Sequence, residues 1–146
     1  MQLYRKGSHT LYDLKYHIVW TTKYRKPILT EERGKRVRDL IREICLTNNV
    51  KILRGHVSKD HIHIFISVPP QISVSKIAQL IKGKTSRKLL QEDKTLSKMY
   101  WGQHLWARGY FATTSGQITD EMIMEYINNQ DEDQDKRGDG FTILST

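Results

Sequence analysis

The chain has 146 residues, of which 38% are hydrophobic and 27% charged, a composition typical of one soluble globular domain with a buried core. No apolar run approaches the roughly 20 residues of a membrane-spanning helix, and the N-terminal stretch lacks a signal-peptide core. The single cysteine, Cys45, fits a reducing compartment, so we expect a cytoplasmic protein, and our leading interpretation has no membrane partner. Lys and Arg number 24 against 16 acids, and this basic excess indicates a polyanionic partner, with nucleic acid first and an anionic membrane second.

The first half of the chain predicts a strand followed by a helix. Residues 1–10 look like a loose basic leader, and the aromatic and β-branched stretch "YDLKYHIVWTT" predicts a strand over 12–22. The basic connector "KYRKPIL" comes next, and Thr30 is a suitable N-cap for a helix that ends near "TNN". The apolar positions of this helix recur with helical spacing and include the single cysteine, which we interpret as packing: Val37, Leu40, Ile41, Ile44 and Cys45.

The second half predicts a hairpin, two helices and one more strand. Strands are expected over 50–57 and in "DHIHIFISVPP", joined by a tight connection at 58–60. Ser73 can cap a second helix, residues 105–115 are a fourth strand candidate, and residues 119–121 open a third helix that runs to about residue 130. The polar residues 131–146 form a tail.

This order of elements predicts an α+β fold of the ferredoxin-like kind. Its pattern is β-α-β-β-α-β, with an antiparallel sheet, helices on one face of the sheet, and an additional C-terminal helix that carries Tyr126. We expect one domain over residues 1–146, with a core of about 12–130.

Two histidines in "DHIHIFISVPP" are the first candidates for a functional site. Side chains alternate along a strand, so His61 and His63 share one face about 7 Å apart, a spacing from which both can reach one metal ion. The isoleucines and valine between and after them point to the other face, which the helices should cover. His17 and His56 fall on other strands, and no spacing in the sequence assigns them to this site.

The last helix adds a tyrosine and an amide on one face. Tyr126 and Gln130 are four residues apart, one turn from each other. Two imidazoles and one amide oxygen form an uncharged site suited to Mg²⁺ or Mn²⁺ held partly by a substrate phosphate, and a tyrosine beside it could attack the phosphorus. From the helix alone, a boundary tyrosine and a solvated glutamine would explain the pattern equally well.

The chain as a whole resembles a known family. "DHIHIFISVPP" resembles the His-hydrophobic-His signature of HUH nucleases, and residues 12–130 resemble the single-tyrosine, TnpA-like transposases of small insertion sequences (the IS-two-hundred type). Four further segments resemble that family in the same order: "YHIVWTTKYRKPIL", "QLIKGKTSRKLL", "LWARGYFATTSG" and "EYINNQ". Ser115 is a small departure, since a branched apolar residue is commoner there.

The resemblance implies roles for individual residues. His61 and His63 match metal-binding histidines, Tyr126 matches a nucleophilic tyrosine, and Gln130 matches a third metal ligand, with Asn129 as the fallback. It also implies a homodimer that recognises hairpins in single-stranded DNA and forms a 5′-phosphotyrosine link without ATP or another nucleotide cofactor. The strand at 105–115 is a candidate for pairing across the two-fold axis.

Basic and aromatic residues of two segments are candidates for DNA binding. They could follow phosphates and stack on bases, or they could be ordinary solvated charges: Lys23, Tyr24, Arg25, Lys26, Lys82, Lys84, Arg87 and Lys88. Three alternatives to an active transposase stay open. They are a non-catalytic DNA- or RNA-binding module or regulator, a metal-dependent phosphodiesterase in which Tyr126 is dispensable, and a domesticated relative that cuts host repeats.

Overall fold

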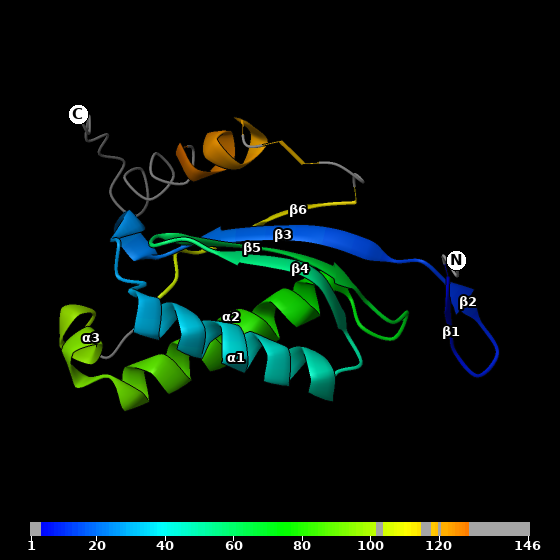
Figure 1. The fold of residues 1–146 in the computed structure, drawn as a ribbon, viewed down its shortest axis with the longest axis horizontal. Coiled ribbons are helices and arrows are strands. Elements are labelled where there is room, and N and C mark those ends of the chain that lie inside the picture. Colours follow the sequence, from blue (N-terminus) through cyan, green and yellow to red (C-terminus); the bar gives the residue numbers. More distant parts are fainter. Residues whose placement is uncertain (1–3, 102–103, 115–117, 120, 129–146) are drawn as a thin grey trace.

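The computed structural model describes residues 4–101, 104–114, 118–119 and 121–128 (Figure 1). Its strands are β1 (Arg5–Lys6), β2 (Leu11–Tyr12), β3 (Lys15–Thr21), β4 (Lys51–Val57), β5 (His61–Ser67) and β6 (Phe111–Thr113). Its helices include the 3₁₀ turn η1 (Lys23–Arg25), α1 (Glu31–Thr47), α2 (Val74–Glu92) and α3 (Lys94–Met99). A further helix covers residues 121–128.

The main sheet is antiparallel, with the strand order β4-β5-β3-β6. The two central strands pair over their whole lengths, from Lys15 opposite Ser67 to Thr21 opposite His61. Helices α1 and α2 lie side by side on one face of this sheet, and helix 121–128 lies on the other (Figure 1). This arrangement confirms the α+β fold of the ferredoxin-like kind that the sequence predicts.

The helices begin where the sequence places their caps. The hydroxyl of Thr30 accepts a hydrogen bond from the backbone of Arg33, and that of Ser73 accepts one from Lys76. These hydroxyls satisfy backbone N–H groups that have no partner within the helix. Cys45 is buried in α1, and burial raises the pKa of its thiol to about 12, which agrees with a packing role.

Two sequence predictions need correction at their boundaries. The supposed loose leader contains β1, and Tyr12, predicted as the start of the first long strand, belongs to β2. Arg5 holds this β1–β2 hairpin to the sheet by donating to the carbonyls of Ser67 and Asn49, both at 2.9 Å. The predicted strand 105–115 is only β6 plus an isolated bridge between Trp106 and Thr22. Trp106 and its neighbours on both sides are all buried, and Gly109 has a φ of 78°, so this stretch cannot keep the alternation of a strand.

Helix α3 is a further element that the sequence pattern does not predict. It is only six residues long, and its N-cap is Asp93, whose Oδ1 accepts from the backbone of Leu96 at 2.9 Å. A single turn and a half is too short to show helical periodicity. Among the described residues, no helix is long and apolar enough to cross a membrane.

Candidate active site

The two faces of the main sheet differ completely in chemistry. On β5, Ile62, Ile64 and Ile66 are at most 3% exposed and pack beneath α1 and α2; we call this side the isoleucine face. His61 and His63 project from the opposite side, which we call the histidine face. The alternation that the sequence predicts is therefore confirmed, and helix 121–128 lies above the histidine face (Figure 1).

His61 is held by the residue that precedes it. Its Nδ1 lies 2.8 Å from Oδ1 of Asp60, and a carboxylate only accepts, so Nδ1 donates. Burial alone would raise the pKa of Asp60, but the hydrogen bond from His61 and the charges of His61 and Arg25 outweigh it, and the net pKa is lowered. Because Nδ1 holds its proton in this hydrogen bond, Nε2 is the ring nitrogen of His61 that could bind a metal ion.

The same carboxylate contacts a basic residue of η1. Oδ2 of Asp60 lies 3.4 Å from Nε of Arg25, and Nη1 of Arg25 lies 3.3 Å from Oδ1 of Asn128. Arg25 therefore contacts both the loop that begins β5 and the helix that carries Tyr126.

His63 lies in a group of aromatic and cationic side chains. Its Nε2 is 2.9 Å from Nδ1 of His17, a fully buried residue whose ring stacks on Phe65 at 4.1 Å between centroids. Burial, then the nearby charges of His17 and Arg54, lowers the pKa of His63 to about 4. The ring of His63 is accordingly neutral at pH 7.

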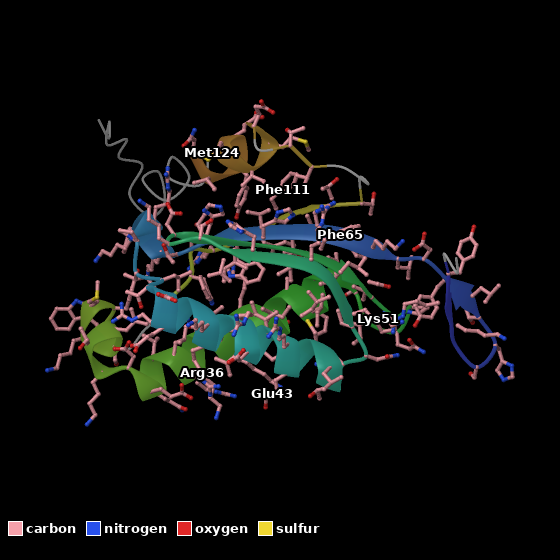
Figure 2. The ribbon with its side chains drawn as sticks, in the orientation of Figure 1. Arg36, Glu43, Lys51, Phe65, Phe111 and Met124 are labelled. Carbon is pink, nitrogen blue, oxygen red and sulfur yellow. The ribbon has the colours of Figure 1, made fainter. Side chains whose placement is uncertain are left out.

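Helix 121–128 is seated on the histidine face by its apolar side. Ile127 is only 1% exposed, and the ring of Tyr126 lies 5.9 Å from that of Phe111 on β6. Figure 2 shows Phe111 between the sheet and this helix. The hydroxyl oxygen of Tyr126 is itself buried. The predicted third helix is confirmed over residues 121–128, and its predicted end near residue 130 lies outside the described residues. The hydroxyl of Thr119 accepts a hydrogen bond from the backbone of Met122 at the start of this helix.

The described side chains around His61 and His63 supply some, but not all, of the ligands that a divalent metal ion needs. Two imidazoles stand two residues apart on one face. The ring of His63 is neutral at pH 7, and the hydrogen bond from Nδ1 of His61 to Asp60 leaves Nε2 of His61 as the atom that could bind an ion. Within the described part of the chain, no three His, Cys, Asp or Glu side chains converge as a metal site. Gln130 and its fallback Asn129 lie outside the described residues, so the predicted third ligand stays a prediction.

The first group of predicted DNA-binding residues forms a strained turn after β3. Tyr24 and Arg25 have φ angles of 62° and 52°, in the left-handed region that L-residues rarely adopt. The turn is held by Thr22, whose hydroxyl donates to the carbonyl of Lys26 at 2.8 Å. Tyr24 is 62% exposed, and the ammonium of Lys23 lies 5.5 Å from the centre of its ring.

The second group lies on α2, on the other side of the sheet from helix 121–128. Lys84, Arg87 and Lys88 are exposed. Lys82 differs, because its ammonium donates to the carbonyls of Ala107 at 2.9 Å and Gly109 at 2.6 Å, and burial lowers its pKa to about 8. The structure uses Lys82 to hold the segment before β6 against α2.

Several residues of the site are not predicted from the sequence. His17 could be recognised only through the register that sets its strand beside His63. His56 lies directly opposite His63, because a bulge between Ile52 and Arg54 shifts the rest of β4 by one residue. Asp60 could have been predicted from the sequence, because a carboxylate next to a candidate ligand histidine is a frequent orienting partner.

Comparison with known proteins identifies the family. Residues 10–130 match the family described as "Transposase IS200 like". The chain belongs to this family. It is 37% identical over 136 residues to the transposase of insertion sequence element IS200 from Salmonella typhimurium, covering 93% of this chain and 88% of that one. It is 30% identical over 126 residues to the ISDra2 transposase TnpA of Deinococcus radiodurans, covering 86% and 90% of the two chains.

Solved structures agree with this assignment. A crystal structure of a Deinococcus radiodurans R1 protein assigned as a transposase matches with a TM-score of 0.79 and 30% identity, over 86% of this chain and 97% of that one. A REP-associated tyrosine transposase bound to a REP hairpin matches with a TM-score of 0.52 over 87% of this chain and 70% of that one. Because the sequence identity is only 13%, the similarity to this second structure shows a shared fold alone.

Proposed function

We propose that this IS200-like transposase cleaves and rejoins single-stranded DNA at insertion-sequence ends through a covalent 5′-phosphotyrosine on Tyr126. The observation that carries the proposal is the seating of the tyrosine helix on the histidine face, where His61 and His63 stand side by side. A binding module would need neither this pair of imidazoles nor a tyrosine helix above them.

In each step of the proposed reaction one phosphoester bond forms as another breaks, so no external energy source is needed. The phenolic oxygen of Tyr126 attacks the phosphorus, the bond to the 3′ oxygen breaks, and the phenolic proton passes to solvent or a base while the 3′ oxygen gains one. In the second step, the 3′ hydroxyl of another strand attacks the phosphotyrosine and releases Tyr126. The energy of the broken phosphodiester is kept in the intermediate, so no ATP is needed.

His61 and His63, with Gln130 as the predicted third ligand, would hold the divalent ion. Mg²⁺ or Mn²⁺ bound there would offset negative charge on the phosphate oxygens. The protein's own contribution is to keep the ring of His63 neutral and to fix the orientation of His61 through Asp60. An uncharged ligand set leaves the phosphate to supply the negative charge that such ions require.

DNA binding belongs to the same proposal. The REP hairpin in the related complex is consistent with hairpin recognition by this chain. Phosphates would be contacted by the half-buried lysines of the strained turn and by the exposed cations on α2, and Tyr24 would stack on an unpaired base. A homodimer remains part of the proposal. β6 lies at one edge of the described sheet and is three residues long, so a partner strand could extend it.

A covalent-adduct assay tests the proposal. Labelled single-stranded DNA from the gene's flanks is incubated with protein and Mn²⁺ and resolved on a denaturing gel, beside Tyr126→Phe and a matched Tyr4→Phe control. We expect a metal-dependent protein–DNA band in wild type and Tyr4→Phe, absent in Tyr126→Phe. Cleavage that persists in Tyr126→Phe would indicate a metal-dependent phosphodiesterase, and binding without cleavage would indicate a binding module.

A further inference from the structure

Arg25 occupies a position that a simple phosphate ligand would not need. Its guanidinium lies between the carboxylate of Asp60, 3.4 Å from Nε, and the amide oxygen of Asn128, 3.3 Å from Nη1. Asp60 is only 15% exposed at its side chain and Arg25 29%, so this ion pair is partly shielded from water. Two N–H groups of the Arg25 guanidinium therefore already contact other residues of the protein.

The backbone around Arg25 is shaped to direct its side chain inward. Two consecutive non-glycine residues, Tyr24 and Arg25, adopt positive φ angles, a conformation that costs roughly 1–3 kcal/mol at each residue and persists only where its surroundings enforce it. The backbone N–H of Arg25 donates to the carbonyl of Thr22 at 3.0 Å, which closes the turn. The chain therefore spends conformational energy at the point from which the guanidinium reaches Asp60.

These contacts form one continuous chain of polar groups. His61 donates to Oδ1 of Asp60, Arg25 contacts Oδ2 of the same carboxylate, and the opposite end of Arg25 contacts Asn128, two residues after Tyr126 on the helix. Because a guanidinium is planar and presents donors on both edges, it can hold both partners at once, which a lysine ammonium on a flexible stem does less well.

We propose that Arg25 is a positioning residue that fastens helix 121–128 to the Asp60–His61 pair, and so couples the seating of Tyr126 to the orientation of His61. This inference rests on the proposed function for its catalytic consequence, but the fastening itself is a property of the free protein. It replaces the expectation that Arg25 acts by contacting DNA phosphates.

The first test measures helix seating without DNA or metal. A nitroxide is attached at Met124→Cys, which is on the helix, 45% exposed and labelled in Figure 2. The native Cys45 is buried with a raised pKa, so the label goes to the new thiol. We expect Arg25→Ala and Asn128→Ala to increase the mobility of the label, Arg25→Lys to increase it less, and the exposed control Arg42→Ala on α1 to leave it unchanged.

The second test separates positioning from DNA contact. In the same variants, affinity for flank DNA is measured over a salt series, and the rate of adduct formation is measured at saturating DNA. The proposal predicts a 10- to 100-fold lower adduct rate for Arg25→Ala with unchanged affinity and salt slope. Asn128→Asp, which adds a charge facing Arg25, should keep the label immobile.

One pattern would overturn the proposal. If Arg25→Ala leaves label mobility unchanged but weakens DNA binding and lowers the salt slope by about one, Arg25 is a phosphate ligand. If wild type forms no adduct on any flank sequence, the proposed function fails, and label mobility still decides whether Arg25 fastens the helix.

Discussion

The isoleucine face and the histidine face are made from alternate residues of the same strands, yet they are built for different purposes. Ile62, Ile64 and Ile66 are covered by α1 and α2, and burial of each such side chain contributes roughly 1.5–3 kcal/mol to stability. On the histidine face, polar side chains contact one another: His61 with Asp60, and His63 with His17. Stability and chemistry are therefore carried by separate residues one position apart.

This separation makes the two faces independently testable. A substitution on the isoleucine face should change the free energy of unfolding and leave the rate per folded molecule alone. A substitution of a polar side chain that the proposal places in the reaction, such as His61, should mainly do the reverse. Any variant that violates this pattern shows where the two faces are coupled.

The largest effect is expected from His61→Ala. Loss of one of the two histidines proposed to hold the ion should remove several kcal/mol of transition-state stabilisation, a fall of roughly 10³-fold in the rate of adduct formation. The melting temperature should fall less than for a core substitution, because the side chain of His61 lies on the histidine face, 17% exposed, and outside the isoleucine core. Single-turnover adduct assays and thermal melts check this, with the exposed His9→Ala as the matched control. If His61→Ala lowered the melting temperature strongly but kept the wild-type adduct rate per folded molecule, the assignment of chemistry to the histidine face and stability to the isoleucine face would be contradicted.

The next largest effect is expected on the isoleucine face, where a substitution should change stability and not the reaction rate. Ile66 is fully buried, so Ile66→Ala should lower the free energy of unfolding by about 2–5 kcal/mol through lost burial and a cavity. Urea denaturation measures this, and Leu46→Ala, at a position 83% exposed, should cost far less. The adduct rate per folded molecule should stay within about twofold of wild type. A large loss of rate at full folding would mean that core packing sets the geometry of the site.

A smaller effect is expected from Asp60→Asn. The substitution keeps the shape of the side chain but removes the charge that holds His61 in one tautomer. We expect the Mn²⁺ concentration for half-maximal adduct formation to rise 10- to 100-fold. A metal titration measures it, with the exposed Asp39→Asn on α1 as control. An unchanged midpoint would show that His61 needs no orienting carboxylate.

The smallest effect is expected far from the site, at the start of α1. Thr30→Ala removes the cap that accepts from Arg33, and it should cost about 1 kcal/mol of stability with no change in adduct rate. Denaturant unfolding provides the measurement, and Thr47→Ala near the other end of the helix is the comparison. Equal losses for the two threonines would show that the capping hydrogen bond contributes nothing specific.

The fold could be predicted from the sequence because its elements are long and regular. The helical stripe of α1, the caps Thr30 and Ser73, and the alternation of β5 each depend on neighbouring residues alone. The shortened strand β6 and the hairpin near Arg5 could not be predicted. In these segments the outcome depends on contacts with distant parts of the chain, such as Arg5 with Asn49.

The candidate site was predictable to the same extent. The positions of His61, His63 and Tyr126 on their faces follow from spacing within one strand and one helix, whereas their roles rest on the family resemblance and stay a prediction. His17 and His56 depend on the register between strands and on a bulge, neither of which leaves a local pattern. The double role of Arg25 requires two loops and a helix to meet, and charge alone suggested only a phosphate contact.

The most direct measurement is to locate the DNA attachment on the protein. Wild-type protein is reacted with flank DNA and Mn²⁺, digested with nuclease and protease, and the nucleotide-bearing peptide is sequenced by mass spectrometry. A 5′-phosphate linked to the phenolic oxygen of Tyr126 is the predicted result. Attachment at another residue, or cleaved DNA with no attached peptide, would contradict a site in which the tyrosine helix serves the histidine face.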